Sequence, residues 1–469
     1  MSRSESRALL LVAAFAVSAA APVRAASAEP EAARVRAMTL REAVAYARAH
    51  QPAIRAALAR VRAQQEEAKV PRSQWLPLAG VTAQIFGGTA NNTTGGYLTP
   101  SFMDIPRIGG TRGVSSGTLR PYASTFVGGS ITQEAFDFGR IAAQSAAADA
   151  VADVERARQR GAILDVTYAV EEAYFAVFAA KAIVKASDDA YERARVHRDL
   201  AKAGVDAGLR PPIELTRAEA DLAKLDIGRL RARGGLAAAE DVFAAAVGVS
   251  EPALDVADAP PKPEELPALA AAITAAEARD PRLLEALAAL RAQEAKTRAI
   301  GAELRPDLSL TATVSGRAGG APPSGNGEPA NGDGFIPNVP NWDVGLVLAW
   351  PLFDGTVSAR EGAARAEEDA RREEIAEARH EEIAAVRAAY AAVEIARGVL
   401  PGLARAVDAA RANYTQADAR FRAGLGTSVE IADAEAVRED AEIQLALGQF
   451  ELARARSAFG RAIAEGASP

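Results

Sequence analysis

The chain has 469 residues, with 61 acidic and 54 basic side chains and a formal net charge of −7. Binding to nucleic acid needs clustered positive charge, so this balance argues against a nucleic-acid partner. Apolar residues make up 49% of the chain but aromatic residues only 5%, which favours thin seams between Ala-rich helices over a thick core. The sequence contains no cysteine, which excludes disulfide bonds and lipid attachment to a cysteine.

Residues 1–28 have the pattern of a secretory signal peptide. Two arginines precede the apolar run "ALLLVAAFAVSAAA", and small residues follow it, which is the order expected of a signal. Cleavage is expected after Ala25 or Ala28, and the apolar run is too short to favour a membrane-spanning helix. No later stretch has about eighteen consecutive apolar residues, so a mature chain that enters a membrane must do so as strands of a closed barrel. We therefore expect an exported protein that is not lipidated.

Two pairs of similar segments indicate an internal repeat. "QPAIRAALARVRAQ" at 51–64 and "DPRLLEALAALRAQ" at 280–293 agree at seven of fourteen positions. "AGLRPPIELTRAEA" at 207–220 and "AGLGTSVEIADAEA" at 423–436 also agree at seven of fourteen positions. The chain is therefore expected to hold two copies of one structural unit.

The two repeats are expected at 39–248 and 268–465, and a Pro-rich linker at 249–267 joins them, since its prolines exclude regular structure. Each repeat has the pattern of a short helix, a medium helix, two strands around a long loop, a very long helix, a glycine turn and a last helix. The strands are expected at about 76–86 and 122–136 in the first repeat, and at about 307–316 and 341–353 in the second.

The long helices exceed the usual size of a globular helix. The pattern from about 139 to about 202 contains no proline, and at ~1.5 Å per residue it spans on the order of 95 Å. Its counterpart runs from about 356 to about 422, where Pro401 is expected to kink it. Helices that bury mainly Ala suit close packing in a bundle or coiled coil. A plain coiled coil without a channel has the same helical pattern.

The predicted strands carry the signal for a membrane. Apolar and polar residues alternate in them, and 12 of the 25 aromatic residues lie within 75–138 and 335–353. Alternating strands with aromatic girdles are typical of transmembrane barrels, and Trp342 and Trp350 are expected at the membrane interface, in contact with outer-membrane lipid. Four strands cannot close a barrel, so several chains must contribute, and three chains would form one of twelve strands. Two soluble hairpins at the end of a periplasmic coiled-coil scaffold are the alternative.

Several segments resemble the TolC-like outer membrane efflux protein family: the opening "TLREAVAYARAHQPAIRAA", the exits "FDFGR" and "FDGTVSA" into long helices, and both glycine turns. The resemblance covers essentially the whole mature chain. It implies an α+β fold of mainly long α-helices, in which a trimeric, 12-stranded transmembrane β-barrel with four strands per chain continues as a periplasmic α-helical barrel. The linker 249–267 would then lie in the equatorial region.

The resemblance also implies a function and partners. Members of the family form the outer-membrane exit duct of a tripartite efflux pump, a passive channel that a periplasmic adaptor protein connects to an inner-membrane pump. The same duct serves type I protein secretion, so that alternative stays open. The expected location is the outer membrane, with the helices reaching into the periplasm and the chain assembled as a homotrimer.

Site residues follow from the same resemblance. The glycine turns would form the periplasmic tip and contact the adaptor through Ala207, Gly208, Leu209, Ala423, Gly424 and Leu425. Glu430, Asp433 and Glu214 fall where the family places constriction carboxylates, although an acidic residue on such a charged helix is usually a solvated surface group. One departure is Gly426, because the best-known member has a basic gating residue there. A salt-bridge latch of that kind is therefore not expected.

Other chemistry is not indicated by the sequence. His50, His197 and His380 are scattered without the spacing of metal ligands. The Gly-rich run at 109–117 lies in a predicted loop, not between a strand and a helix, so it does not predict a nucleotide site. No nucleophile stands in a recognisable motif with a base. We therefore predict no enzymatic activity, no cofactor and no metal.

Overall fold

The computed structural model describes residues 37–89, 121–249, 254–257, 265–319 and 339–465. The expected signal peptide at 1–28 lies outside these residues. The elements in chain order are α1 (Leu40–His50), α2 (Pro52–Glu67), α3 (Val70–Ser73), β1 (Leu78–Thr89), β2 (Pro121–Phe136), α4 (Arg140–Asp206), α5 (Pro212–Val247), α6 (Leu269–Arg279), α7 (Pro281–Gly301), the 3-10 turn η1 (Ala302–Leu304), β3 (Asp307–Gly319), β4 (Val339–Ala349), α8 (Gly355–Arg422) and α9 (Ser428–Ala462).

The order of elements is nearly the same in the two halves of the described chain. Helices lead into two strands, and these lead into a helix of 67 residues (α4) or 68 residues (α8) and a last helix. The helix α8 continues through Pro401. The α+β fold with long helices and four strands is therefore confirmed. No helix among the described residues is both long and apolar enough to cross a membrane.

Polar residues begin several of these helices at the positions where backbone N–H groups lack a helical partner. Thr39 forms a capping box with Glu42 at the start of α1. Asp354 accepts a hydrogen bond from the backbone N–H of Thr356 (2.7 Å) at the start of α8. Asp137 accepts from the N–H of Gly139 (3.0 Å) where β2 leads into α4. The acidic residue in each exit sequence therefore starts the long helix that follows the strands.

The strands form one antiparallel sheet in the order β1-β2-β3-β4. Val81 of β1 pairs with Gly129 of β2, and Val314 of β3 pairs with Trp342 of β4. A register shift at Glu134/Phe136 marks the end of the β2–β3 pairing near the helices. The strands β1 and β4 are the outer ones of this sheet, and exposed apolar side chains lie on both.

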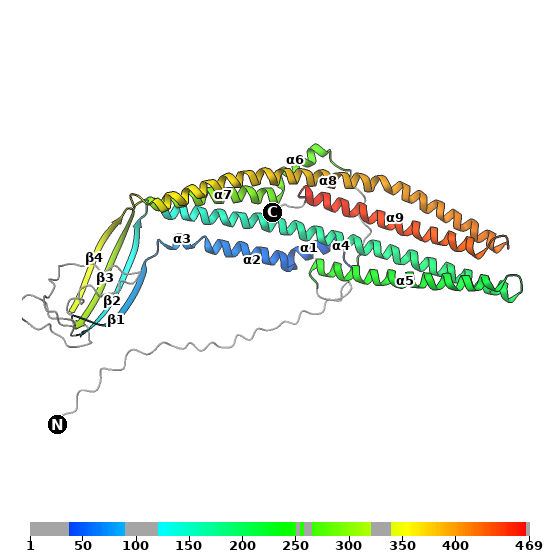
Figure 1. Ribbon diagram of the computed structural model, residues 1–469, viewed down its shortest axis with the longest axis horizontal. Helices are drawn as coiled ribbons and strands as arrows, with labels where there is room; N and C mark the ends of the chain where they lie inside the picture. The colour runs from blue at the N-terminus through cyan, green and yellow to red at the C-terminus, as the bar shows by residue number, and fades with distance from the viewer. Residues whose placement is uncertain (1–36, 90–120, 250–253, 258–264, 320–338, 466–469) are drawn as a thin grey trace, which may run out of the picture. The chain divides into compact units, whose positions relative to one another are not determined.

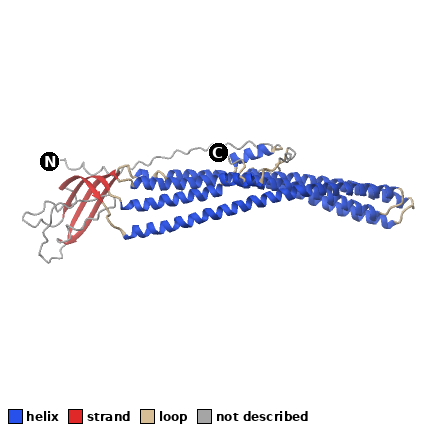
Figure 2. Ribbon diagram, turned by 90° about the horizontal axis from the view of Figure 1, so that it is seen from above, coloured by secondary structure: helices blue, strands red, loops and turns tan. Residues whose placement is uncertain are grey.

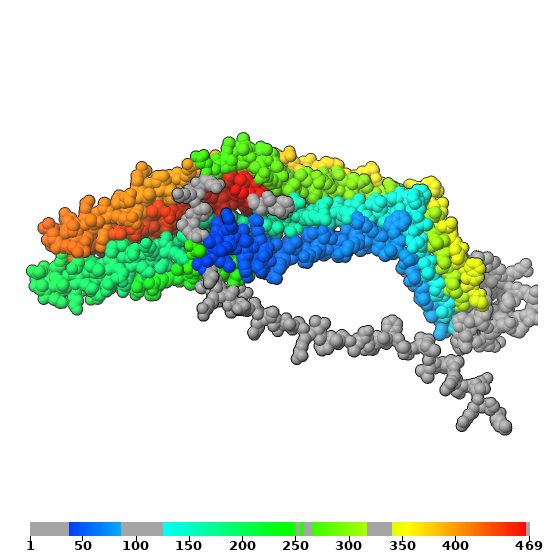
Figure 3. Space-filling view, turned by 180° about the vertical axis from the view of Figure 1, so that it is seen from behind, coloured from blue at the N-terminus to red at the C-terminus, as the bar shows by residue number. Residues whose placement is uncertain are grey.

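The long helices pack along one another, with α4 against α5, α7 and α9, and α8 against α7 and α9. The sheet joins them at one end, and the turns α4–α5 and α8–α9 lie at the other (Figures 1 and 2). The space-filling view shows the hairpin α8–α9 alongside the hairpin α4–α5 (Figure 3). Small side chains dominate the buried seams, and a cluster at the turn end consists of Ala201, Ala218, Ala417, Phe421, Ile431 and Ala434.

Candidate functional site

The two helical turns have the same backbone structure. In the first, Gly208 has a φ of 72°, and the N–H of Leu209 donates to the carbonyl of Gly204 (2.9 Å). In the second, Gly424 has a φ of 75°, and the N–H of Leu425 donates to the carbonyl of Arg420 (2.9 Å). A left-handed residue just beyond the last helical turn is the usual way to satisfy its free carbonyls, and glycine adopts that conformation without strain.

Apolar side chains project from both turns into solvent. Leu209 is 83% exposed and Leu425 is 74% exposed. Ile213 and Val429, each four residues further on, are also more than half exposed. Clustered apolar groups at the end of a hairpin are typical of a surface that another protein covers. The glycine-turn pattern predicted the leucines but not Ile213 and Val429, although these two apolar residues stand at equivalent positions of the two repeats.

The three predicted carboxylates have different surroundings. Glu214 is half-buried and paired with Arg210 (2.5 Å). Glu430 is exposed and lies 3.6 Å from Arg420. Asp433 is exposed and has no ion pair with any described residue. Glu430 and Asp433 therefore stay close to solvent, whereas the charge of Glu214 is already compensated within the chain.

Arg210 connects the first turn to the other hairpin. Its guanidinium donates to the carbonyl oxygen of Phe421 in α8 (2.6 Å) and lies 3.7 Å from the centre of the Phe421 ring. A cation over an aromatic face and a charge-assisted hydrogen bond both stabilise this contact. Sequence analysis missed it because the partners stand 211 residues apart.

Gly426 is the counterpart of Arg210 in the second turn. A Cβ atom at Gly426 would lie 3.1 Å from the backbone nitrogen of Phe421 and 3.2 Å from Glu430 Oε2. A side chain at Gly426 would therefore require a small local movement of its neighbours in the second turn, although Arg210 occupies the equivalent position of the first turn. The missing basic residue at Gly426 does not leave the site without one, because Arg210 reaches the second hairpin from the first turn.

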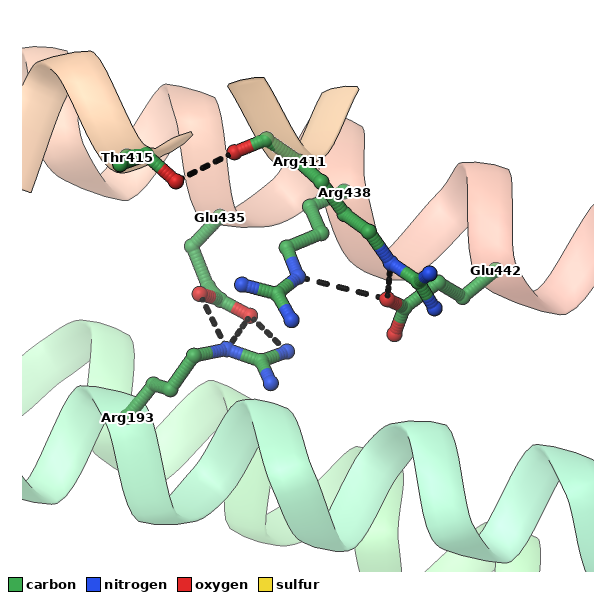
Figure 4. A network of polar contacts seen from close by, with 6 residues as sticks. All are labelled: Arg193, Arg411, Thr415, Glu435, Arg438 and Glu442. Carbon is green, nitrogen blue, oxygen red and sulfur yellow. Dashed lines mark hydrogen bonds and ion pairs between the residues drawn. The ribbon is translucent and has the colours of Figure 1, made fainter. Parts of the chain in front are cut away.

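Polar contacts further from the turns join the two hairpins and also link α8 to α9 (Figure 4). Arg193 of α4 donates to both carboxylate oxygens of Glu435 of α9, at distances from 2.7 to 3.0 Å. Glu442 accepts from Arg411 of α8 (2.9 Å) and from Arg438 (3.3 Å). Burial raises the pKa of Glu435, and the ion pair with Arg193 opposes this rise. Such a buried pair stabilises one register of α4 against α9, because loss of either partner leaves a buried charge.

The two tryptophans that were predicted at the membrane interface lie in or directly after β4, an edge strand of the sheet. Trp342 is in β4, whereas Trp350 follows the strand, which ends at Ala349 before Pro351. Proline cannot donate a ladder hydrogen bond, so the strand ends there. Both tryptophans are exposed. Among the described residues, no group of three or more His, Cys, Asp or Glu side chains could hold a metal ion.

Comparisons with known proteins agree with this architecture. A family model described as outer membrane efflux protein matches residues 43–249 and 272–465. The structure is similar to that of the outer-membrane channel OprN, with 23% identity, a TM-score of 0.70, and coverage of 92% of this chain and 91% of that chain. A search of curated proteins found no significant match.

Two further solved channels have the same fold. The CmeC outer membrane channel of Campylobacter jejuni has 16% identity and a TM-score of 0.70, with coverage of 91% of this chain and 86% of that chain. The open state of the MtrE outer membrane channel of Neisseria gonorrhoeae has 19% identity and a TM-score of 0.67, with coverage of 92% and 89%. These identities are low, so the likeness extends to the fold alone.

Proposed function

The chain belongs to the outer membrane efflux protein family and is an outer-membrane efflux channel rather than an enzyme, and we propose that three copies form an exit duct that is narrowest at the helical turns. Each chain supplies four strands, with β1 and β4 at the outer positions. Unpaired strand edges are unfavourable in lipid, so the sheets of several chains must join until the barrel closes. Three chains would form a barrel of twelve strands, within the range of known membrane barrels.

The opposite end of the duct is proposed to contact the adaptor. The exposed Leu209, Ile213, Leu425 and Val429 form an apolar surface at the turns. A periplasmic adaptor protein would cover this surface, and the left-handed Gly208 and Gly424 keep the turns narrow enough for it. The adaptor in turn would connect the duct to an inner-membrane pump that supplies the driving force.

The carboxylates of the second turn are proposed to line the constriction. In a trimer, Glu430 and Asp433 would place six acidic groups around one axis. Such a ring attracts cations and repels anions, because the charges add where the lumen is narrow. Glu214 would contribute less, since Arg210 already neutralises it.

Export and membrane insertion complete the proposal. Residues 1–28 would be removed as a signal peptide after Ala25 or Ala28, and mass analysis of the mature protein would identify the cleavage site. Trp342 and Trp350 would lie where lipid meets water, because indole rings favour that interface.

The observation that carries the proposal is the placement of both exposed turns at the end of the helices remote from the sheet. After extraction of the membrane fraction in detergent, mass measurement is expected to give the mass of a trimer. The purified trimer is expected to show single-channel conductance in planar bilayers. A monomer that remains soluble without detergent would instead indicate a periplasmic scaffold.

Removal of the two carboxylates tests the constriction. The double variant Glu430→Ala/Asp433→Ala is expected to raise conductance and to weaken block by divalent cations about tenfold, or ~1.4 kcal/mol. The variant Glu265→Ala/Glu451→Ala removes the same charge from exposed positions outside the turns and is the matched control. Equal block in the two variants would place Glu430 and Asp433 on the solvated outer surface.

A further inference from the structure

His197 is a buried titratable group between the two hairpins near the turns. It lies in α4, is only 7% exposed, and its ring contacts the ring of Phe421 in α8 edge to face, with 4.5 Å between centroids. Its Nε2 atom is enclosed and has no hydrogen-bond partner among the described residues. Phe421 thus contacts both His197 and Arg210, so two basic side chains meet at one aromatic ring.

A small cavity of ≈ 50 Å³ borders His197 between α4, α5, α8 and α9. The charged and titratable groups that face His197 or line this cavity are Glu214, Asp221 and Lys224 of α5, Asp418 and Tyr414 of α8, Glu435 and Glu439 of α9, Arg193 of α4, and Arg210 of the first turn.

Most of these groups already have a partner of opposite charge. Glu214 pairs with Arg210, Glu435 with Arg193, and Asp418 with Arg422. Lys224 is the basic side chain that most opposes the raised pKa of Glu439, whereas Asp221 forms no ion pair with any described residue. Asp221 is therefore the carboxylate near His197 whose charge is not already compensated, and it favours the charged imidazole less than burial opposes it.

We propose that His197 makes the contact between α4 and α8 sensitive to pH, such that mild acid favours separation of the hairpins and widening of the duct at the turns. The proposal rests on the proposed function, in which these turns form the constriction. The packed arrangement accommodates the neutral imidazole, which makes no hydrogen bond through Nε2. An imidazolium there would be buried with its Nε2–H group lacking a hydrogen-bond acceptor, and burial of a charge without a full set of hydrogen bonds is strongly unfavourable.

The direction follows from linkage. Burial lowers the pKa of His197 below its ordinary value of 6.5, and Asp221 opposes this shift. The packed state therefore binds fewer protons than a state in which His197 is hydrated. The part of the free energy by which neutral His197 favours the packed state is lost as the pH falls through 6.5. Between pH 7.5 and 5.5, an ordinary imidazole in the separated state can raise the ratio of separated to packed hairpins by at most about tenfold.

The separation of the hairpins can be measured directly. The chain has no cysteine, so spin labels can be placed on Lys202→Cys in α4 and Gln416→Cys in α8, both exposed. When labelled chains are diluted with an excess of unlabelled, cysteine-free chains, electron paramagnetic resonance reports the intrachain distance alone. In the full-length protein in lipid nanodiscs, the fraction with a longer distance is expected to rise up to tenfold from pH 7.5 to pH 5.5. His197→Gln, whose amide does not titrate in this range, is expected to abolish this rise.

His380→Gln is the matched control, since His380 is an exposed histidine on the same helix as Phe421; it is expected to retain the wild-type response. If His197→Gln does not fold, His197→Asn replaces it. An unchanged pH response in the His197 variant, or no response in the wild type, overturns the proposal. Conductance at pH 7.5 is recorded separately, so that a protein with no channel activity would count against the duct itself and not against His197.

Discussion

The two repeats have a similar order of elements but use different polar contacts, and the contrast is clearest at two pairs of equivalent positions. At the turns, Arg210 of the first repeat corresponds to Gly426 of the second. Arg210 bonds to the opposite hairpin, whereas Gly426 permits a tight turn and leaves Glu430 beside the exposed Arg420. The same backbone thus supports a contact between hairpins in one repeat and a carboxylate near solvent in the other.

The second pair is Gln51 and Asp280, which precede α2 and α7. Gln51 donates to the carbonyls of Ala245 and Ala246 at the end of α5 (3.1 and 2.7 Å). Asp280 caps α7 by accepting from the N–H groups of Arg282 and Leu283. Equivalent positions of the two repeats therefore have similar backbone structure, but their side chains form different contacts.

The largest expected effect concerns Asp280, which shares a hydrogen bond with Glu382 of α8. Both carboxyl groups are buried, and burial, with the Asp280 charge, raises the pKa of Glu382 to about 7. Because the folded state holds this proton more tightly than the unfolded chain, the stabilisation is complete below pH 4.5 and is lost as the pH rises through 7. The shift corresponds to about 3 kcal/mol.

Thermal unfolding at pH 5 and pH 8 tests this difference between the repeats. From pH 5 to pH 8, the wild type is expected to lose roughly 4 °C more in Tm than Glu382→Gln, whose amide can donate to Asp280 at every pH. Gln51→Glu, which places a carboxylate at the equivalent position of the first repeat, lacks a partner carboxyl of this kind and serves for comparison. Equal pH dependence in wild type and Glu382→Gln would contradict the shared proton.

A smaller effect is expected from the arginines at the turns. Arg210→Ala removes the bond to the Phe421 carbonyl and leaves Glu214 half-buried without its partner, at a cost of about 2 kcal/mol. Conductance in planar bilayers is expected to rise as the hairpins separate. Arg420→Ala removes an exposed pair at 3.6 Å and is expected to cost less than about 0.5 kcal/mol, with little change in conductance. The reverse order of effects would show that the second turn holds the closed arrangement.

These contrasts also separate what local sequence pattern can predict from what it cannot. The alternation of apolar and polar residues predicted the strands, and the glycines predicted the turns, because both signals depend on a few adjacent residues. The bond from Arg210 to Phe421 and the bond from Asp280 to Glu382 join residues far apart in the chain. Ala-rich helices have several registers with similar apolar packing, so no short pattern specifies which polar groups will meet.

The smallest expected effect tests whether the turns share a backbone and differ only in side chains. Gly208 and Gly424 have φ values of 72° and 75°, and no described atom beyond the glycine and its two chain neighbours lies within 4 Å of a Cβ built on either. Gly208→Ala and Gly424→Ala are therefore expected to lower the free energy of unfolding of their turns equally, by about 1 kcal/mol each, through backbone strain alone. Amide hydrogen exchange of each turn would then accelerate about fivefold. A cost that differs several-fold between the two would mean that the contacts of Arg210 already strain or support the first turn, so that side chains and backbone cannot be treated as independent.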